Sequence, residues 1–303
     1  MARNLAAVLA SLVLLGCVSS PVRAVTSPGP VPAPEFPAIT RLEQVLPHLS
    51  TGKAGKTLAV FDIDDTLLMS ERFYGSDSWF KWQYALPADS PDKVPCVFEI
   101  IGINYDALSL VATEKERAGV NVVNGIAVDK LFLTARSSLD RGATVRQLTE
   151  AGYALPRGIG RGRDGLIYRW QPSDDRPADA AKAKDAASEG SGTVVSYFEG
   201  LFMVDGLDKG KLLRSLFRKL DVSYDRVVLV DDSEGNLRAM RDAMKEAGIE
   251  YQGLQYVGVT KYDFARDEIV KDGRAGRDEV VHFLRHLSSS REERLRGPAC
   301  FPR

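Results

Sequence analysis

Short, uninterrupted apolar runs alternate along this chain with segments whose apolar residues recur at helical spacing. The apolar runs cover residues 58–61, 131–134, 193–202, 227–230 and 256–259, and the helical patterns cover 41–49, 141–151, 211–220, 237–247 and 278–287. Apolar runs without polar alternation are typical of parallel strands that are covered by helices on both faces of the sheet. The alternation therefore predicts an α/β fold with a mostly parallel central sheet.

The bulk composition excludes several classes of protein. The 303 residues are 44% hydrophobic and 27% charged, which is typical of a globular chain with a sizeable core and not of a fibrous or disordered one. Forty basic side chains are balanced by 41 acidic ones, which gives a formal net charge of -1. Because no net field attracts a polyanion, we expect no nucleic-acid partner, and the oligomeric state stays open.

The first 24 residues differ from the rest of the chain and predict an export signal. Arg3 precedes an apolar stretch at residues 5–15, which has the length of a signal-peptide core and is too short to span a bilayer. Residues 14–17 resemble a lipobox, which would put a lipid on Cys17, whereas residues 22–24 resemble an ordinary cleavage site that would release a soluble product. An uncleaved anchor is the third alternative. We expect a bacterial protein that is periplasmic or is a membrane-anchored lipoprotein, with the lipid on Cys17 as its membrane contact.

A proline-rich segment at residues 25–38 follows and predicts an extended linker. The globular domain is expected over residues 39–290, and residues 291–303 form a C-terminal tail. Two spacers, at about 68–129 and 136–208, are too long for simple crossover connections. We therefore expect inserted structure that shapes a site.

Two cysteines remain beyond Cys17. Cys96 lies in a proline-flanked segment and Cys300 lies in the tail. In an oxidising compartment such thiols can form a disulfide. Since the sequence does not place them near each other, a Cys96–Cys300 disulfide and two separate thiols both stay open.

Acidic residues follow the first apolar run, at the sheet edge where parallel α/β proteins bind ligands. Asp62 and Asp64 are two residues apart, so on an extended segment both face one pocket while Ile63 faces the core. Two carboxylates this close repel each other, and a Mg²⁺ ion that accepts oxygen ligands would offset that repulsion. The pair therefore predicts a metal site.

Later strand ends supply the groups that such a pocket lacks. Thr134 offers a hydroxyl to a phosphoryl oxygen, and Lys209 supplies a positive charge at the start of a helical pattern. Asp231 and Asp232, with Asn236 beyond them, add oxygen ligands for the metal. The order acidic pair, hydroxyl, lysine, acidic pair predicts a site for a metal and a phosphoryl group.

This order resembles the four motifs of the haloacid dehalogenase (HAD) superfamily. The matching segments are Phe61-Asp62-Ile63-Asp64-Asp65-Thr66, Leu133-Thr134, Lys209-Gly210 and Val230-Asp231-Asp232. The resemblance spans residues 57–259 and implies a Rossmann-like HAD fold with inserted cap elements. Residues 75–80 and 198–201 also resemble a branch of exported bacterial HAD proteins with no assigned physiological role.

The resemblance implies an enzyme that hydrolyses small phosphomonoesters in the cell envelope with Mg²⁺ as its cofactor. Asp62 would be the nucleophile and would form an aspartyl phosphate. Asp64 would protonate the leaving alcohol and then activate water. Members of the superfamily that dehalogenate lack the second aspartate, and the ion-pumping branch has Thr there, so Asp64 favours phosphoester hydrolysis.

The resemblance also implies the remaining ligands. Thr134 and Lys209 would bind the transferring phosphoryl oxygens. The metal set implied by the motifs is Asp62, Asp64 through its backbone carbonyl, Asp232 and Asp231. Because the family usually has Gly-Asp at the fourth motif, it stays open which of Asp231 and Asp232 touches the ion and which orients its waters or the lysine.

Other interpretations stay in play. The chain can be a slow or inactive HAD-fold sensor that binds a phosphorylated ligand or an envelope partner, or an enzyme that transfers the phosphoryl group to an alcohol instead of water. The natural substrate does not follow from the sequence. Four aromatic residues after the first motif can wall a substrate pocket or form the small core of a helical cap, and we favour the core. They are Trp79, Phe80, Trp82 and Tyr84.

Overall fold

The computed structural model describes residues 34–50, 55–107, 110–160, 165–172, 192–259, 271–273, 275, 278 and 282. The chain divides into two units, residues 1–33 and 34–303, and every described residue belongs to the second. The predicted export signal, the lipidation of Cys17 and the tail lie outside the described residues, as do most of the linker and of the predicted helix at 278–287. Those predictions stay predictions.

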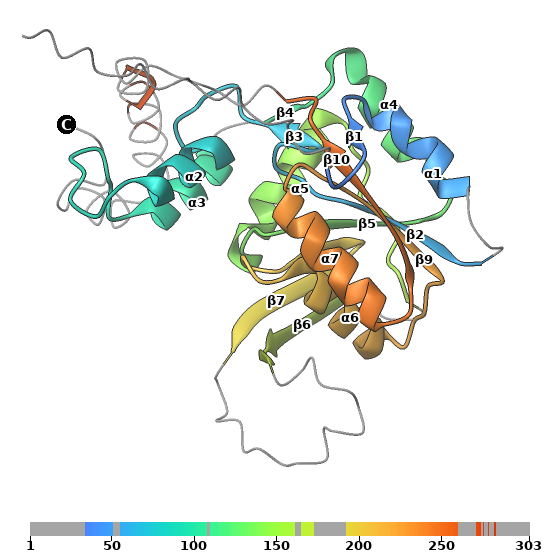
Figure 1. Ribbon diagram of the computed structural model, residues 1–303. Coiled ribbons are helices and arrows are strands. Elements are labelled where there is room, and N and C mark those ends of the chain that lie inside the picture. The colour runs from blue at the N-terminus through green and yellow to red at the C-terminus, as the bar shows by residue number, and fades with distance from the viewer. Residues whose placement is uncertain are drawn as a thin grey trace, which may run out of the picture. The chain divides into compact units, whose positions relative to one another are not determined.

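An eight-stranded sheet forms the centre of the second unit, in the order β1-β10-β9-β2-β5-β8-β7-β6 (Figure 1). The strands are β1 (Ala38–Ile39), β2 (Thr57–Phe61), β5 (Asp129–Thr134), β6 (Gly165–Trp170), β7 (Thr193–Phe198), β8 (Leu201–Met203), β9 (Arg226–Asp231) and β10 (Glu250–Tyr256). The six strands from β1 to β8 in this order run parallel, and β7 and β6 complete the sheet antiparallel. The predicted α/β class with a mostly parallel sheet is confirmed.

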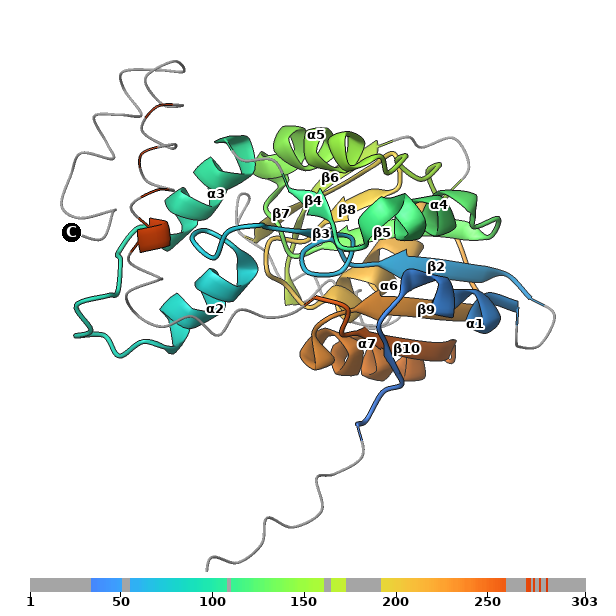
Figure 2. The same ribbon diagram turned by 90° about the horizontal axis from the view of Figure 1, so that it is seen from above.

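Helices cover both faces of the sheet, with α4 and α5 on one face and α6 and α7 on the other (Figure 2). The helices are η1 (Leu42–Val45), α1 (Leu46–Ser50), α2 (Asp77–Ala85), α3 (Val97–Ala107), η2 (Lys115–Arg117), α4 (Ala118–Gly125), η3 (Ser138–Asp140), α5 (Arg141–Ala151), α6 (Lys209–Leu220) and α7 (Glu234–Glu246). Two short strands, β3 (Leu68–Met69) and β4 (Val111–Ala112), pair antiparallel with each other.

The side chains of β2 alternate between two cores. Leu58 and Val60 pack with residues of α6 and α7, whereas Ala59 and Phe61 pack with residues of α4 and α5. Ile63, beyond the end of the strand, continues the second set. The alternation is the two-residue period of a strand, and it confirms that Ile63 faces the core.

Two predicted strands were wrong in their bounds. The run at 193–202 is not one strand but the hairpin β7–β8, because Glu199 and Gly200 turn the chain with φ values of 46° and 68°. The last predicted strand, at 256–259, is β10, which begins six residues earlier at Glu250 and ends at Tyr256. Polar residues interrupt β10, which lies next to the two-residue edge strand β1, so its sequence is not an apolar run.

The first inserted segment carries α2 and α3, which lie side by side in both ribbon views (Figures 1 and 2). Trp79 of α2 is only 1% exposed, and Phe80 and Trp82 pack against the cluster that it forms with buried residues of α3. The aromatic group thus forms a small core, as favoured from the sequence, although Tyr84 is 57% exposed. Cys96, directly before α3, forms a disulfide whose partner lies outside the described residues. None of the helices in the described part of the chain combines the length and the apolar character needed to cross a membrane.

Candidate active site

The register of three adjacent parallel strands brings the first and last motifs together. Phe61 of β2 pairs with Phe132 of β5 and with Val230 of β9. The backbone N–H of Asp62 donates to the carbonyl oxygen of Val230 over 3.0 Å, so Asp62 and Asp231 lie next to each other at the carboxyl edge of the sheet. This is the edge at which open parallel sheets bind ligands.

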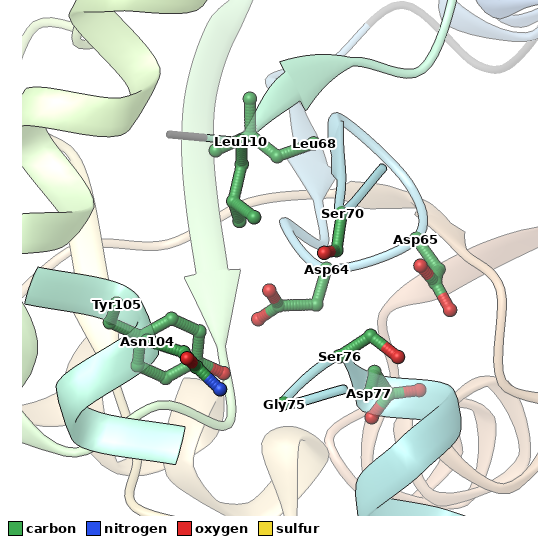
Figure 3. Close-up of a pocket in the computed structure, with 10 residues that line it drawn as sticks. All are labelled: Asp64, Asp65, Leu68, Ser70, Gly75, Ser76, Asp77, Asn104, Tyr105 and Leu110. Atoms are coloured by element: carbon green, nitrogen blue, oxygen red, sulfur yellow. The ribbon is translucent and has the colours of Figure 1, made fainter. Parts of the chain in front are cut away.

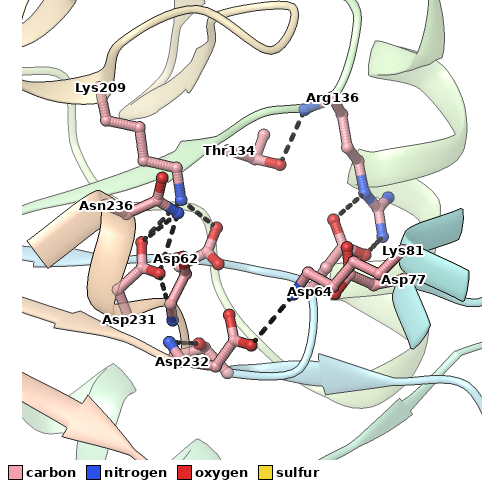
Figure 4. A network of polar contacts seen from close by, with 12 residues as sticks. Asp62, Asp64, Asp77, Lys81, Thr134, Arg136, Lys209, Asp231, Asp232 and Asn236 are labelled. Carbon is pink, nitrogen blue, oxygen red and sulfur yellow. Dashed lines mark hydrogen bonds and ion pairs between the residues drawn. The ribbon is translucent and has the colours of Figure 1, made fainter. Parts of the chain in front are cut away.

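Lys209, the first residue of α6, joins these two aspartates (Figure 4). Its Nζ lies 2.6 Å from Oδ1 of Asp62 and 2.8 Å from Oδ2 of Asp231, and its side chain is 2% exposed. Burial by itself lowers the pKa of this ammonium, but the carboxylates of Asp231 and Asp62 outweigh burial and raise it above its ordinary value. Lys209 is therefore a fixed, buried positive charge.

The carboxyl group of Asp62 is held in a strongly perturbed environment. Burial raises its pKa well above the ordinary value, the carboxylate of Asp231 raises it further, and the ammonium of Lys209 acts in the opposite direction. The raised pKa disfavours the ionised carboxylate of Asp62, and a bound cation would favour it.

Asp231 is fully buried, and its carboxylate accepts several hydrogen bonds. The backbone N–H of Ser233 donates to Oδ1 over 2.9 Å, and Nδ2 of Asn236 lies 3.0 Å and 3.2 Å from the two oxygens. With the contact to Lys209, these bonds use both oxygens of Asp231. Asn236, expected as an oxygen ligand, is therefore placed as a donor to Asp231.

Three carboxylates satisfy the geometry of a divalent-metal site. One oxygen from each of Asp62, Asp231 and Asp232 lies within 4.8 Å of the others. Lys209 contacts Asp62 and Asp231, and every candidate ligand atom is oxygen, which is the donor set that Mg²⁺ prefers. The residues present fit the expected cofactor. Asp232 is further anchored by its backbone N–H, which donates to Oγ1 of Thr66 over 3.1 Å.

The side chain of Asp64 does not join this cluster. The chain turns sharply after it, with Asp65 in the left-handed region at φ 55°. Arg136 then binds the Asp64 carboxylate with two hydrogen bonds, of 2.9 Å from Nε and 2.7 Å from Nη2 (Figure 4). The predicted pair is thus divided between two partners, Asp62 with Lys209 and Asp64 with Arg136.

Arg136 is a site residue that the motif analysis missed. Its guanidinium also donates to Oγ1 of Thr144 over 3.0 Å and to Oε1 of Gln147 over 2.8 Å, and it lies 3.9 Å from the centre of the Tyr105 ring. Its backbone N–H donates to Oγ1 of Thr134 over 3.1 Å, so the threonine of the second motif and this arginine form one unit. Burial opposes the charge, but Asp64 raises the pKa of Arg136. In the sequence, the feature that could have identified Arg136 is its position two residues after Thr134.

A lysine from the first insertion also contacts the group of three carboxylates, through Asp232. Nζ of Lys81, on α2, lies 2.5 Å from Oδ2 of Asp77 and 3.6 Å from Oδ2 of Asp232. Asp232 therefore contacts residues of both the sheet edge and the insertion. Its place on an inserted helix explains why no motif pointed to Lys81.

A pocket lies beside the Asp64 carboxylate, between the segment after β2 and helices α2 and α3 (Figure 3). Its polar wall includes Ser70, Asp77, Asn104 and Tyr105, and its apolar wall includes Leu68 and Leu110. Asp62 of the three-carboxylate group lies two residues before Asp64, which lines this pocket.

A model of the family described as "Protein of unknown function (DUF2608)" matches residues 38–275. No curated protein matches the chain. The class C acid phosphatase from Bacillus anthracis is 13% identical, with 82% of this chain and 86% of that chain covered and a TM-score of 0.35. The HAD domain of the effector protein Lem4 from Legionella pneumophila, an inactive mutant, is 15% identical, with 77% and 99% covered and a TM-score of 0.32. With TM-scores this low, neither similarity is evidence about the activity of this chain.

Proposed function

The chain belongs to the DUF2608 family, whose description gives no activity, and from its own site we propose that it is a HAD-type phosphatase that hydrolyses phosphomonoesters with Mg²⁺. The observation that carries the proposal is the contact of Lys209 with both Asp62 and Asp231, 2.6 Å and 2.8 Å away, beside the carboxylate of Asp232. A buried carboxylate that meets a fixed ammonium and a place for a cation is suited to attack a phosphoryl group.

In the proposed reaction, an oxygen of Asp62 forms a bond to phosphorus while the bond from phosphorus to the leaving alcohol breaks. Lys209 and the hydroxyl of Thr134 hold the phosphoryl oxygens. Asp62, Asp232 and the Asp64 carbonyl would hold Mg²⁺, which would supply positive charge near the phosphoryl oxygens. Asp231 keeps Lys209 in place, because both oxygens of its carboxylate are committed to Lys209, Ser233 and Asn236.

Asp64 is the proposed acid for the leaving alcohol and then the base for water. Asp64 lines the pocket described above, and the two hydrogen bonds from Arg136 fix the plane of its carboxylate. Water that loses a proton to Asp64 then attacks phosphorus and releases Asp62. We regard Arg136 as a positioning residue, since it acts through Asp64.

The cellular setting is a proposal as well. An export signal over residues 1–24 and a lipid on Cys17 would place a phosphatase for small phosphorylated substrates in the cell envelope. The mass of the mature protein tests this, because lipidation adds acyl mass at Cys17 and Cys17→Ser removes it. A mature chain that begins near residue 25 without lipid would contradict the lipoprotein proposal.

Hydrolysis of a chromogenic aryl phosphate by the purified protein tests the activity. We expect turnover that requires Mg²⁺, returns when Mg²⁺ follows a chelator, and falls at least about a thousandfold in Asp62→Asn, because the amide cannot act as the nucleophile. Asp242→Asn, the same change at an exposed residue of α7, should keep the wild-type rate. Full activity in metal-free buffer, or wild-type turnover by Asp62→Asn, would rule the proposal out.

A further inference from the structure

Asp232 is the carboxylate at which two groups of acidic side chains meet. One group is Asp62, Asp231 and Asp232, and the other is Asp65, Asp77 and Asp232; in each group, one oxygen from every member lies within 4.8 Å of the others. Asp232 directly follows β9, whereas Asp77 is the first residue of α2 in the first insertion. Asp232 therefore belongs both to the expected metal site and to the junction between the sheet edge and the insertion.

Two lysines bring positive charge to the expected metal site (Figure 4). Lys209 contacts the carboxylates of Asp62 and Asp231, and Nζ of Lys81 lies 3.6 Å from Oδ2 of Asp232. The side chain of Lys209 is 2% exposed, whereas that of Lys81 is 50% exposed. Moving a buried charge from its partners is costly, and moving a half-exposed one is not. Lys81 is therefore the lysine that can give way to another cation.

Lys81 also has a partner on its own helix. Its Nζ lies 2.5 Å from Oδ2 of Asp77, which is four residues earlier on α2. Burial lowers the pKa of Lys81, but the carboxylates of Asp77 and Asp232 outweigh burial and raise it above its ordinary value, so the side chain is a cation at neutral pH. Because Asp77 moves with the same helix, Lys81 can lose Asp232 and still keep one carboxylate.

A divalent ion held by Asp232 would share that carboxylate with Lys81. The side chain of Asp232 is 5% exposed, so solvent screens the charges around it only weakly. Two cations on one poorly screened carboxylate repel each other, and the negative charge that neutralises one of them attracts the other less. Asp232 therefore cannot bind Lys81 and a divalent ion at full strength at the same time.

We propose that the ammonium of Lys81 competes with Mg²⁺ for the carboxylate of Asp232, and that metal binding parts this contact between α2 and the sheet edge. The inference rests on the metal site of the proposed function and names a residue that sets its affinity. In the metal-free protein, Lys81 gives Asp232 a positive charge. The affinity for Mg²⁺ and the contact of the insertion with the sheet edge are thus linked, since each weakens the other.

The test is calorimetric measurement of Mg²⁺ binding to the purified, metal-stripped protein without substrate. We expect Lys81→Met, which keeps the length of the side chain but removes its charge, to bind Mg²⁺ at least about tenfold more tightly than the wild type. Lys81→Arg keeps the charge and should bind Mg²⁺ about as the wild type does. Lys93→Met, the same change at an exposed lysine of the first insertion, should leave the affinity unchanged. Circular dichroism checks that each variant is folded.

Equal Mg²⁺ affinities of the wild type and Lys81→Met would overturn the inference and leave the phosphatase proposal intact. An affinity of Lys81→Arg as high as that of Lys81→Met would overturn it too, because the charge at position 81 would then not be the competitor. The same gain in Lys93→Met would overturn it as well, since any lysine of the insertion would then act alike. Failure of the proposed metal site looks different, because none of these proteins would then bind Mg²⁺, and the inference would fail with it.

Discussion

At the scale of single residues, the site consists of buried charges that depend on one another. Lys209 is the cation that contacts both Asp62 and Asp231, and all three side chains are less than a tenth exposed. Removing one partner of a buried ion pair leaves the other charge uncompensated, which costs far more than the pair contributes. The stability of the metal-free protein should therefore depend strongly on Lys209.

Lys209→Met keeps the length of the side chain but removes its charge. We expect the free energy of unfolding in urea, measured without divalent metal, to fall by about 3 to 5 kcal/mol. Added Mg²⁺ should recover more stability in this variant than in the wild type, because the ion then supplies the missing positive charge. Lys211→Met, at an exposed position of the same helix, should change stability by no more than about 0.5 kcal/mol. An unchanged free energy of unfolding in Lys209→Met would contradict the account.

The sequence predicted some of these residues and missed others for a physical reason. Residues at strand ends and helix starts could be predicted, because parallel strands place their carboxyl ends at one edge of the sheet. These residues are Asp62, Thr134, Lys209 and Asp231. Arg136 could have been noticed only from its nearness to Thr134. Lys81 and Asn104 lie on inserted helices, whose packing depends on contacts that no local pattern encodes.

At the scale of the elements, α6 is fixed to α7 by a close approach at Gly210. A Cβ at this position would lie 2.5 Å from the backbone oxygen of Ala239 and 2.7 Å from Cβ of Ala243. Since Lys209 precedes this glycine, the contact that sets the distance between the helices also sets where the ammonium lies. The Lys209-Gly210 pair of the third motif thus has a packing explanation as well as a chemical one.

Gly210→Ala should push α6 away from α7. We expect a loss of about 1 to 3 kcal/mol in the free energy of unfolding, which is typical of overpacking, together with a lower kcat because Lys209 moves. Gly142→Ala in α5 is the matched control, since a Cβ there meets nothing within 4 Å and alanine favours the helix by about 1 kcal/mol. Both variants can be compared by thermal unfolding. Equal stabilities for Gly210→Ala and Gly142→Ala would show that the close approach has no energetic role.

Element bounds were predictable where amphipathic spacing was regular. The helical pattern at 141–151 matches α5, and the pattern at 211–220 lies within α6. The hairpin β7–β8 was missed because its turn at Glu199 and Gly200 interrupts an apolar run by only two residues.

At the scale of the whole molecule, the α/β class and the mostly parallel sheet followed from the alternation of apolar runs and helical patterns. Of the two long spacers, the first contains α2 and α3 and the second contains the β6–β7 hairpin. What they contain could not be predicted, because inserted segments pack through tertiary contacts without a repeating pattern. The inserted segments are therefore the parts of the molecule that are hardest to predict from the sequence.

The most direct test of the central claim, that Asp62 is the nucleophile, is to locate the phosphoryl group on the protein. Asp64→Asn should still transfer phosphate from an aryl ester, whose leaving group needs no acid, but should lose the base that activates water. Peptide mass analysis after acid quenching should then find one phosphoryl group on Asp62, and none when Asp62→Asn is added. A phosphoryl group on another residue, or continued phosphate release by Asp64→Asn with Asp62 unmodified, would contradict the account.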